Sequence, residues 1–467
     1  MTTPFKVVIV GGSIAGLTLA HCLHHAGIDY TLLEKRAEIA PQEGASVGVM
    51  PNGARILDQL GLYDAVEALI EPLESAYVGY PDGFKISSLY PRLLRERFGY
   101  PLAFLDRQKL LQILADSLPD YASRVCTGKA AVQLIEGPKR ASVVTADGSV
   151  YEGDIIVGAD GIHSKVRGEM WRLSRMAQPG TVPPTDQESF QCEYSCVFGI
   201  SSANPKLEPG TQINRYNDGW SILCVIGKEG RVFWFLFLHL GARYAYGSAP
   251  RFSEADARQR CELLVDEPFW KDVPFGDIWR TREVCTMVPL EEGVLSRWHW
   301  GCIICVGDSV HKIAPHTGQG ANCAMEDVAA LANRLRTWRD CRANGETETT
   351  TTSPTLDQML GEFVADRKAR MQFISQSAHF AMRLHARKGI LNKLIGRYYL
   401  PLAGDLPANQ ASKGIAAGVC IDYLPLPSRN GPGWIQFGGP SSEHKKNKCR
   451  TLLVISPCSV GVHVRHR

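Results

Sequence analysis

The sequence lacks any run of about 18 uninterrupted apolar residues, the length that a membrane-spanning helix requires. The apolar run at 232–238 has only seven residues, which is typical of a buried strand. An excess of one charge is also absent. The 51 Lys and Arg residues against 48 Asp and Glu residues give a net charge of +3, which is too small over 467 residues for a nucleic-acid-binding protein. Repeats and heptad patterns are missing as well, so we expect neither a nucleic-acid partner nor a purely structural role.

No secretory signal peptide precedes the 14 scattered cysteines, so we expect an intracellular, reducing setting in which they are small core residues. Cys302 and Cys305 form a CxxC pattern, but no second pair accompanies them, and a strand would point their thiols to opposite faces. We therefore predict no metal site. With 45% apolar and 21% charged residues, the composition is that of a globular enzyme of two or three domains or one interleaved fold.

A glycine-rich turn follows the first strand-like run of the chain. Residues 5–10 (FKVVIV) lead into GGSIAG at 11–16, and a helix-like stretch follows at 17–25. A second apolar run ends at Glu34, eighteen residues after Gly16, the spacing expected of an acid that accepts hydrogen bonds from an adenosine ribose. The strand, turn, helix and acid together predict a dinucleotide site; a glycine turn without a ligand is the alternative.

Three residues of this turn have a physical role that their type explains. Gly11 permits the tight turn, and Gly16 lets the helix approach the strand, so that the N–H groups of the first helical turn can receive a pyrophosphate. Ser13 replaces the middle glycine of the usual pattern. Its side chain crowds the phosphate position, although its hydroxyl can also donate to a phosphate oxygen.

Two later segments repeat the order of strand, glycine-aspartate turn and helix. The first, DIIVGADGIHSKVR at 154–167, contains Asp160, and the second, GDSVHKIAPHTGQGAN at 307–322, contains Asp308. The three motifs in this order resemble the group A, aromatic-hydroxylase-like, FAD-dependent monooxygenases, over roughly residues 5–340. The resemblance implies bound FAD, NADPH as a co-substrate without a domain of its own, and O2.

The resemblance also implies an α/β, in part α+β, fold: a Rossmann-like FAD-binding domain interleaved with an antiparallel β-sheet substrate domain, plus C-terminal helices. The strand-like runs at 192–201, 212–216, 220–227 and 231–240 suit that sheet, whose aromatic residues form either an apolar pocket or a core. We assign 1–75, 100–185 and 286–343 to the FAD-binding domain, 76–99 and 186–285 to the substrate domain, 344–355 to a Thr-rich loop, 356–433 to a helical region and 434–467 to a basic tail.

Within the second segment, Asp308 could accept hydrogen bonds from the ribityl chain, or it could be an ordinary helix-capping residue. Gly320 and Ala321 open a predicted helix at 321–336, whose N–H groups would face the flavin's pyrimidine edge. The resemblance adds Gly48, whose backbone would pass the flavin. It also adds Arg107, which would reach FAD beside its pyrophosphate; taken alone, Arg107 would be a solvated charge on a helix.

His311 and His316 lie in the same loop as Asp308. A structural hydrogen bond is the expected role of His311, and His316 has no stronger claim to a chemical role.

More closely, VVIVGGSIAGLTLAHCL at 7–23, VFGIS at 197–201 and AGVCIDYLPLPSRNGP at 417–432 resemble fungal paxilline-type and meroterpenoid-pathway FAD epoxidases. This implies epoxidation of a prenyl alkene on an apolar small molecule, before cyclisation by a partner terpene cyclase. Tyr216 matches the position usually offered as catalytic, where it would position the substrate; a sheet tyrosine with a satisfied hydroxyl is the alternative.

Two rival functions stay open, an aromatic-ring hydroxylase of the same fold and a flavin-binding protein without turnover. The segment 451–464 is too short to span a bilayer, which leaves a peripheral membrane contact or an altered tail as interpretations.

Overall fold

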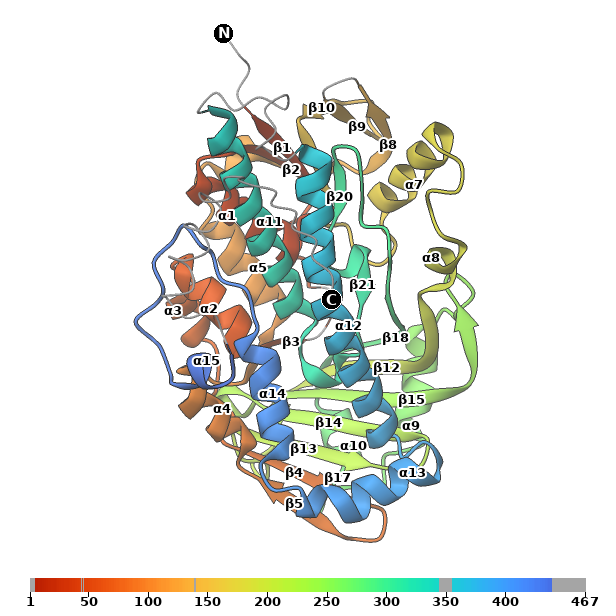
Figure 1. Ribbon diagram of the computed structural model, residues 1–467. Helices are drawn as coiled ribbons and strands as arrows, with labels where there is room; N and C mark the ends of the chain where they lie inside the picture. Colours follow the sequence, from red (N-terminus) through yellow and green to blue (C-terminus); the bar gives the residue numbers. More distant parts are fainter. Residues whose placement is uncertain (1–4, 43, 45, 138–139, 344–354, 439–467) are drawn as a thin grey trace, which may run out of the picture.

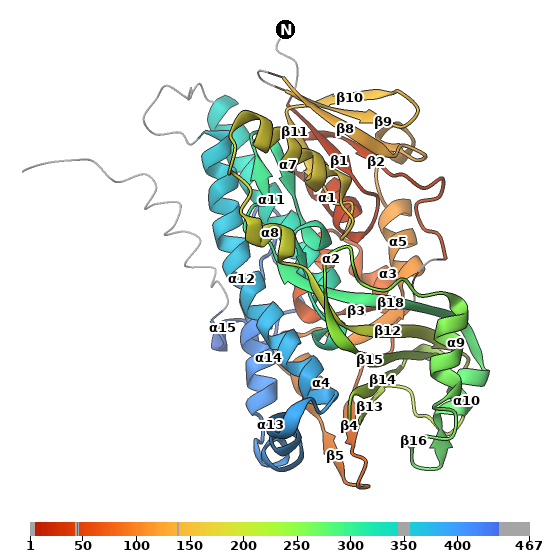
Figure 2. The same cartoon turned by 90° about the vertical axis from the view of Figure 1, so that its right-hand side faces the viewer.

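The computed structural model describes residues 5–42, 44, 46–137, 140–343 and 355–438. It is a mixed α/β structure with helices at the C-terminal end, which confirms the predicted fold class (Figures 1 and 2). The predicted Thr-rich loop, apart from Thr355, and the basic tail from residue 439 onward lie outside the described residues. Within the described residues, no helix is both long and apolar enough to cross a bilayer.

A six-stranded sheet forms the core of the upper part in Figure 1. Its five parallel strands are almost entirely apolar and buried, as expected where helices cover both faces. Helices α1 (Ile14–Ala26) and α11 (Gly320–Ala343) pack against each other beside it. The strand order is β19 (His299–Trp300, antiparallel), β20 (Ile303–Cys305), β11 (Ile155–Gly158), β1 (Lys6–Val10), β2 (Asp29–Leu33) and β7 (Val125–Cys126).

The second large sheet has eight strands and lies across the lower part of the molecule (Figure 1). All neighbours are antiparallel except β13 and β4. The order is β21 (His311–Lys312), β18 (Arg282–Val294), β12 (Gln191–Ser201), β15 (Val232–Ala245), β14 (Trp220–Ile226), β13 (Thr211–Tyr216), β4 (Ser75–Gly79) and β5 (Lys85–Ser88).

Strand alternation divides the aromatic residues of β15 between two cores. Phe233, Phe235 and Phe237 join the core shared with the nucleotide-binding part, whereas Trp234 and Leu236 join a separate core with α9 and α10. The aromatic residues of this sheet are therefore partly core, and one of its faces looks toward the glycine motifs.

Helix α12 (Leu356–His385) links the two parts of the molecule. It packs on α11 in the upper half and on β18 in the lower half, and α13 (Gly389–Leu394) and α14 (Leu406–Ala416) follow at the lower end (Figures 1 and 2). Its N-terminus is fixed by a capping box between Thr355 and Gln358.

The remaining elements cover the edges of these layers. The helices are α2 (Pro51–Gln59), α3 (Tyr63–Glu67), α4 (Tyr90–Phe98), α5 (Arg107–Asp116), α6 (Tyr121–Arg124), α7 (Lys165–Ala177), α8 (Pro184–Glu188), α9 (Glu254–Glu262), α10 (Phe275–Arg280) and α15 (Gly433–Gln436). The short strands are β3 (Ser46–Val49) with β6 (Ala103–Asp106), β8 (Ala131–Glu136) with β9 (Ala141–Thr145) and β10 (Val150–Gly153), and β16 (Pro268–Trp270) with β17 (Val273–Pro274). Short 3-10 turns lie at η1 (Lys228–Gly230), η2 (Gly307–Ser309), η3 (Pro315–Thr317) and η5 (Leu400–Leu402), and a π-turn lies at η4 (Ile395–Tyr399).

Several elements extend beyond the predicted bounds. The first helix begins at Ile14 rather than residue 17, because Ser13 occupies the N-cap position and Gly16 is accommodated inside the helix. Helix α11 continues to Ala343, and strand β15 continues to Ala245.

Candidate functional site

The glycine turn after β1 is closely packed against the neighbouring strand. Gly11 has φ +113°, a conformation that favours glycine, and a Cβ at this position would lie 2.4 Å from the carbonyl oxygen of Ala159. A Cβ on Gly16 would lie 1.9 Å from the carbonyl oxygen of Gly11. The N-terminus of α1 is thus held directly against the end of the sheet.

Glu34 and Arg107 both contact this turn. The Glu34 carboxylate is buried and accepts a 2.7 Å hydrogen bond from the backbone N–H of Gly12, and Arg107 Nη2 donates to Ser13 Oγ at 2.7 Å. Glu34 also accepts from the backbone N–H of Arg36 at 3.0 Å. The structure therefore brings Gly11, Ser13, Gly16, Glu34 and Arg107 together at the start of α1.

We predict that Arg107→Met weakens FAD binding about tenfold, because the variant keeps the aliphatic stem but loses a charged donor beside the pyrophosphate position. Fluorescence titration of the apoprotein with FAD measures the change. Lys109→Met, on the exposed side of the same helix, is the matched control. An unchanged dissociation constant for Arg107→Met would show that Arg107 stabilises the protein through Ser13 and does not contact the cofactor.

Asp160 lies beside the turn, but its carboxylate accepts hydrogen bonds from the start of another helix, α7. It accepts from the backbone N–H groups of Lys165 at 2.7 Å and Val166 at 3.1 Å, and from Ser164 Oγ at 2.5 Å, at the start of α7. Burial raises the pKa of Asp160, and these donors oppose that shift. Its backbone is the part that faces the glycine turn, because a Cβ on Gly11 would lie 2.9 Å from the Asp160 nitrogen.

The turn that contains Asp308 lies between helices α1 and α11. A Cβ on Gly307, which has φ +62°, would lie 3.8 Å from Cβ of Ala15 in α1 and 3.2 Å from Cβ of Ala324 in α11. The Asp308 side chain is partly exposed and pairs with Lys312. A further contact ties this turn to the segment of Asp160, since Arg167 Nη1 donates to the carbonyl oxygen of Ser309 at 2.6 Å.

Asn322 joins Gly48 to the start of α11. Its Nδ2 donates to the carbonyl oxygens of Gly48 at 2.9 Å and Gly318 at 2.7 Å, while its Oδ1 accepts from the backbone N–H of Met50 at 3.0 Å. Gly320 and Ala321, the predicted flavin-facing residues, open α11 next to this contact. No sequence pattern around Asn322 predicts these contacts, because its partner Gly48 lies 274 positions away.

These residues fit a bound flavin dinucleotide. The first N–H groups of a helix have no intrahelical acceptor, and both α1 and α11 begin here without an acidic residue in the first turn. A Cβ on Gly320 would meet no described atom within 4 Å, so the backbone is open to a ligand at that point. Gly11–Gly16, Glu34 and Arg107 would hold the adenosine and pyrophosphate, and Gly48, Asp308, Gly320 and Ala321 the ribityl chain and flavin.

Tyr216 ends β13 on the sheet face that looks toward the glycine motifs. Its ring is buried, stacks on His385 at a centroid distance of 4.3 Å and meets Tyr80 edge to face at 5.5 Å. Burial raises the pKa of Tyr216 well above its ordinary value of 10. His316, in the loop after Asp308, lies 5.0 Å from His385, so the structure connects Tyr216 to this loop through two imidazoles.

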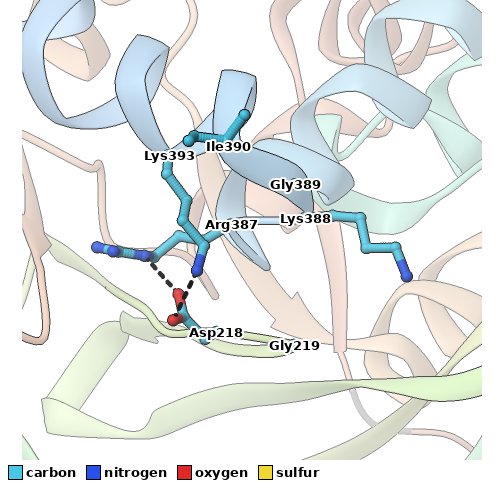
Figure 3. A pocket seen from close by; sticks show the side chains of 7 residues that line it. All are labelled: Asp218, Gly219, Arg387, Lys388, Gly389, Ile390 and Lys393. Atoms are coloured by element: carbon cyan, nitrogen blue, oxygen red, sulfur yellow. Dashed lines mark hydrogen bonds and ion pairs between the residues drawn. The ribbon is translucent and has the colours of Figure 1, made fainter.

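A pocket of about 360 Å³ lies just beyond Tyr216, at the turn between β13 and β14 (Figure 3). It is lined by Asp218 and Gly219 from that turn, by Arg387 and Lys388 from the connection after α12, and by Gly389, Ile390 and Lys393 from α13. Asp218 pairs with Arg387 at 2.8 Å and with Lys393 at 2.9 Å. The turn between β13 and β14 and the segment at the start of α13 therefore meet through ion pairs.

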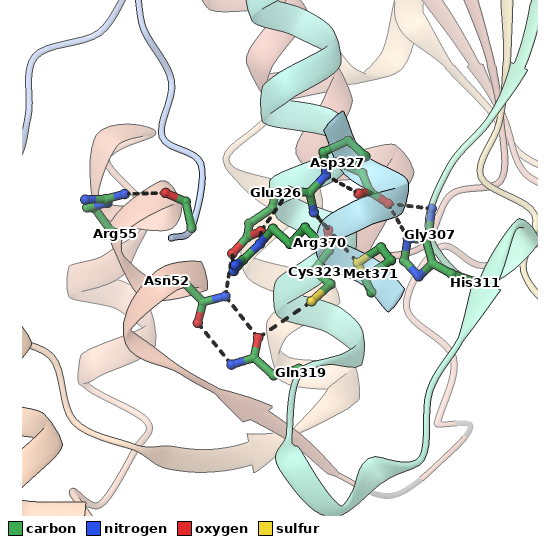
Figure 4. A network of polar contacts seen from close by, with 12 residues as sticks. Asn52, Arg55, Gly307, His311, Gln319, Cys323, Glu326, Asp327, Arg370 and Met371 are labelled. Atoms are coloured by element: carbon green, nitrogen blue, oxygen red, sulfur yellow. Dashed lines mark hydrogen bonds and ion pairs between the residues drawn. The ribbon is translucent and has the colours of Figure 1, made fainter. Parts of the chain in front are cut away.

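A buried charge network holds α11, α12 and the Asp308 loop together (Figure 4). Arg367 donates to Asp327 at 2.7 Å and to Glu326 at 3.0 Å, and Asp327 also contacts His311 Nε2 at 2.5 Å. Burial alone would raise the pKa of Asp327, but His311 and Arg367 lower it to about 2. His311 thus has the structural hydrogen bond expected from the sequence.

Sequence reasoning missed Arg367, because a lone arginine in an amphipathic helix carries no local sign of burial. It also gave no role to His385. Among the described residues, no group of three His, Cys, Asp or Glu side chains is arranged to hold a metal ion.

Comparison with known proteins gives concordant results. The FAD binding domain family matches residues 4–346. The FAD-dependent monooxygenase pyr5 of Aspergillus fumigatus is 54% identical over 466 residues, 98% of each chain. The FAD-dependent monooxygenase cdmI of Talaromyces verruculosus is 52% identical over 97% of this chain and 93% of its own length.

Solved structures share the fold. Klebsiella pneumoniae HpxO complexed with FAD and uric acid has a TM-score of 0.71 at 21% identity, covering 89% of this chain and 97% of that one. A salicylate hydroxylase substrate complex has a TM-score of 0.61 at 18% identity, covering 88% and 98%. Together with the family match and the fungal relatives, this confirms the resemblance predicted from the three motifs: the chain belongs to the FAD binding domain family, within its group of fungal FAD-dependent monooxygenases.

Proposed function

We propose that this protein uses NADPH, bound FAD and O2 to epoxidise the alkene of a prenyl chain on an apolar small molecule, in fungal secondary metabolism. FAD would supply the activation of O2 and its transfer to the alkene. The protein would bind both molecules, orient the alkene and exclude water. The relatives that support this proposal are named only as FAD-dependent monooxygenases, so the epoxidation is our inference.

One observation carries the proposal, namely the apolar, aromatic character of the sheet face that looks toward the glycine motifs. Phe198 and Phe235 on that face, together with Phe104 of β6, which packs against Phe235, form a continuous aromatic wall, with ring centroids 5.6 and 6.1 Å apart. Such a wall suits an apolar chain, which gains free energy by leaving water.

The same face has poor groups for removing a phenolic proton, which the rival ring hydroxylation would require. Burial lowers the pKa of His385 to about 3 and that of His316 well below its ordinary value, so both imidazoles are weak bases. Tyr216 stays protonated at all ordinary pH values, because burial raises its pKa. Epoxidation needs no such base.

The position of the new oxygen tests the proposal. Purified holoenzyme with NADPH and 2-farnesylphenol should form a product one oxygen heavier, and NMR should place that oxygen on the farnesyl chain. Oxygen on the aromatic ring would favour the ring hydroxylase instead. Flavin reduction without any product over a panel of prenylated phenols would contradict both enzymes.

We expect Tyr216→Phe to act mildly, because the ring keeps its contacts with His385 and Tyr80 and only the hydroxyl is lost. The amount of product formed per NADPH consumed should fall about threefold to tenfold, which is the effect of losing one hydrogen bond to the substrate. The rate of flavin reduction should not change. Tyr151→Phe, on a half-buried side chain of β10 in the separate three-stranded sheet, is the control. A loss above about a thousandfold would mean that Tyr216 transfers a proton in the reaction.

The C-terminal helices present an exposed apolar surface, which we infer to be a peripheral membrane contact. A large apolar substrate would be met most readily at such a surface, and the pocket at the start of α13 lies beside it. An epoxide product is acid-sensitive, so a neighbouring terpene cyclase is the partner that we propose to receive it. The surface comprises Ile390, Leu391, Leu394, Tyr398, Tyr399 and Leu402, with exposed fractions of 77, 67, 50, 61, 54 and 86%.

Replacing Leu391 and Leu402 together by serine should weaken binding to phosphatidylcholine vesicles containing phosphatidylserine at least tenfold, because two buried leucines would be lost. Vesicle co-sedimentation measures this. Leu263→Ser removes an equally exposed leucine from the C-terminal end of α9 and should bind as the wild type does. Equal binding of all three proteins, or none, would contradict a membrane contact at 390–402.

A further inference from the structure

Several buried polar atoms in the lower part of the molecule lie without a partner among the described residues. Both ring nitrogens of His316 are in this group, as are Ser221 Oγ and Asn214 Oδ1. Buried polar atoms in folded proteins nearly always have a hydrogen-bond partner, so a cluster of unpaired ones indicates that something else fills that role.

Strand register places these atoms on one face of the sheet. Ser221 in β14 pairs with Tyr216 in β13 on one side and with Phe237 in β15 on the other. Directly opposed residues in antiparallel strands have their side chains on the same face, about 5 Å apart. Asn214 lies two residues before Tyr216 and therefore points to that face too.

The two imidazoles lie over this row of residues. His316 packs on Phe237 at a centroid distance of 3.9 Å, and His385 stacks on Tyr216 at 4.3 Å, with 5.0 Å between the two imidazoles. Ser221 is thus flanked by the two residues on which the imidazoles rest. Among the described residues His316 makes ring contacts but no side-chain hydrogen bond, so both of its nitrogens remain for a ligand.

The chemistry of the cluster defines what it can bind. Burial lowers the pKa of His316, so the ring is neutral and offers one N–H donor and one nitrogen acceptor. Ser221 can donate or accept, and the free oxygen of Asn214 accepts. A hydroxyl or carbonyl group matches these atoms. The nearest cation, Arg383, is already paired with Glu193 and Glu292, so a neutral group fits the cluster better than an anion.

We propose that His316 and Ser221, with Asn214, form a polar subsite that receives the hydroxyl or carbonyl head of a prenylated substrate, while His385 holds His316 in place. The aromatic wall of Phe104, Phe198 and Phe235 begins one row away, because Phe235 lies two residues from Phe237 on the same strand face. The site therefore selects molecules with a hydrogen-bonding head and an apolar chain. This inference rests on the proposed function and adds the feature by which the substrate is recognised.

Binding to the oxidised holoenzyme, without NADPH, tests the subsite separately from turnover. Isothermal titration compares 2-farnesylphenol with its methyl ether, which has the same chain but no hydroxyl to donate. The wild type should bind the phenol at least tenfold more tightly, because the ether leaves a buried acceptor unpaired. His316→Phe keeps the stacking and should bind both compounds equally, whereas His316→Gln keeps a donor and an acceptor and should regain part of the preference. His379→Phe, on an exposed residue of α12, should behave as the wild type.

Two results would overturn the subsite. A preference for the phenol that survives His316→Phe would show that the head binds elsewhere, and a large loss of FAD affinity in that variant would assign the imidazole to the cofactor. A wild type that binds neither compound would contradict the proposed substrate class itself, and the subsite with it. Epoxidation of the farnesyl chain with no preference for the phenol would leave the proposed function standing and reject the subsite alone.

Discussion

Replacing Gly16 by alanine is expected to abolish FAD binding. The new Cβ would lie 1.9 Å from the carbonyl oxygen of Gly11. Because that oxygen belongs to the backbone and the backbone fixes the position of the Cβ, no side-chain rotation can relieve the clash. Either α1 or the glycine turn must shift, and with it the N–H groups that would receive the pyrophosphate. We expect the dissociation constant for FAD to rise more than a hundredfold and the purified protein to be colourless.

A matched control separates this clash from the general effect of a helical alanine. Gly168 lies inside α7, where a Cβ would meet no described atom within 4 Å. Gly168→Ala should bind FAD normally and be stabilised by up to about 1 kcal/mol, because alanine favours helix over glycine. A Gly16→Ala protein that is purified yellow and titrates with FAD as the wild type does would contradict the geometry of the turn.

Arg367→Met should cost about 3–5 kcal/mol of folding free energy. The substitution keeps the volume of the side chain but leaves Asp327 and Glu326 buried with fewer positive partners. Arg370 still contacts Glu326 at 2.5 Å, so the main loss is at Asp327. Chemical denaturation of the wild type and the variant measures the difference.

The control is Arg334→Met, which removes two ion pairs between the same two helices at the surface. Arg334 contacts the exposed Glu362 and Asp366, and a loss of no more than about 1 kcal/mol is expected. Equal losses in the two variants would mean that burial adds nothing to the network.

The effect of Arg367 should also depend on pH. Asp327 has its pKa lowered from 3.8 to about 2, so its ionised form stabilises the folded state fully above pH 4, and this contribution disappears as the pH falls toward 2. The difference between wild type and Arg367→Met should therefore shrink over that interval. A difference that is constant from pH 5 to pH 2.5 would show that Asp327 is not the group involved.

The parts of the site that could be predicted are those with local signals. The strand, the glycines and the acid at Glu34 lie within one short stretch, so their geometry follows from φ preferences, helix geometry and a fixed spacing. The order of the three motifs then indicated the family and, through it, the fold. Asp160 shows the limit of motif reasoning, because its carboxylate caps α7 while only its backbone approaches the turn.

The contacts that complete the site join residues far apart in the sequence. Asn322 bonds to the carbonyl oxygen of Gly48 across 274 positions, and Arg367 to Glu326 across 41. No sequence pattern around either residue predicts its partner, because the pairing depends on how α11 packs against β3 and α12. The same holds for His316 and His385, which meet only when the end of α12 reaches the sheet.

Labelling with ¹⁸O2 tests the central claim most directly. Holoenzyme, NADPH and 2-farnesylphenol under ¹⁸O2 should give a product that contains one ¹⁸O atom, located by mass fragmentation on the farnesyl chain, with about one NADPH consumed for each product formed. A product oxygen that comes from water, or no product despite a fully reduced flavin, would contradict the account of this protein as an FAD-dependent epoxidase.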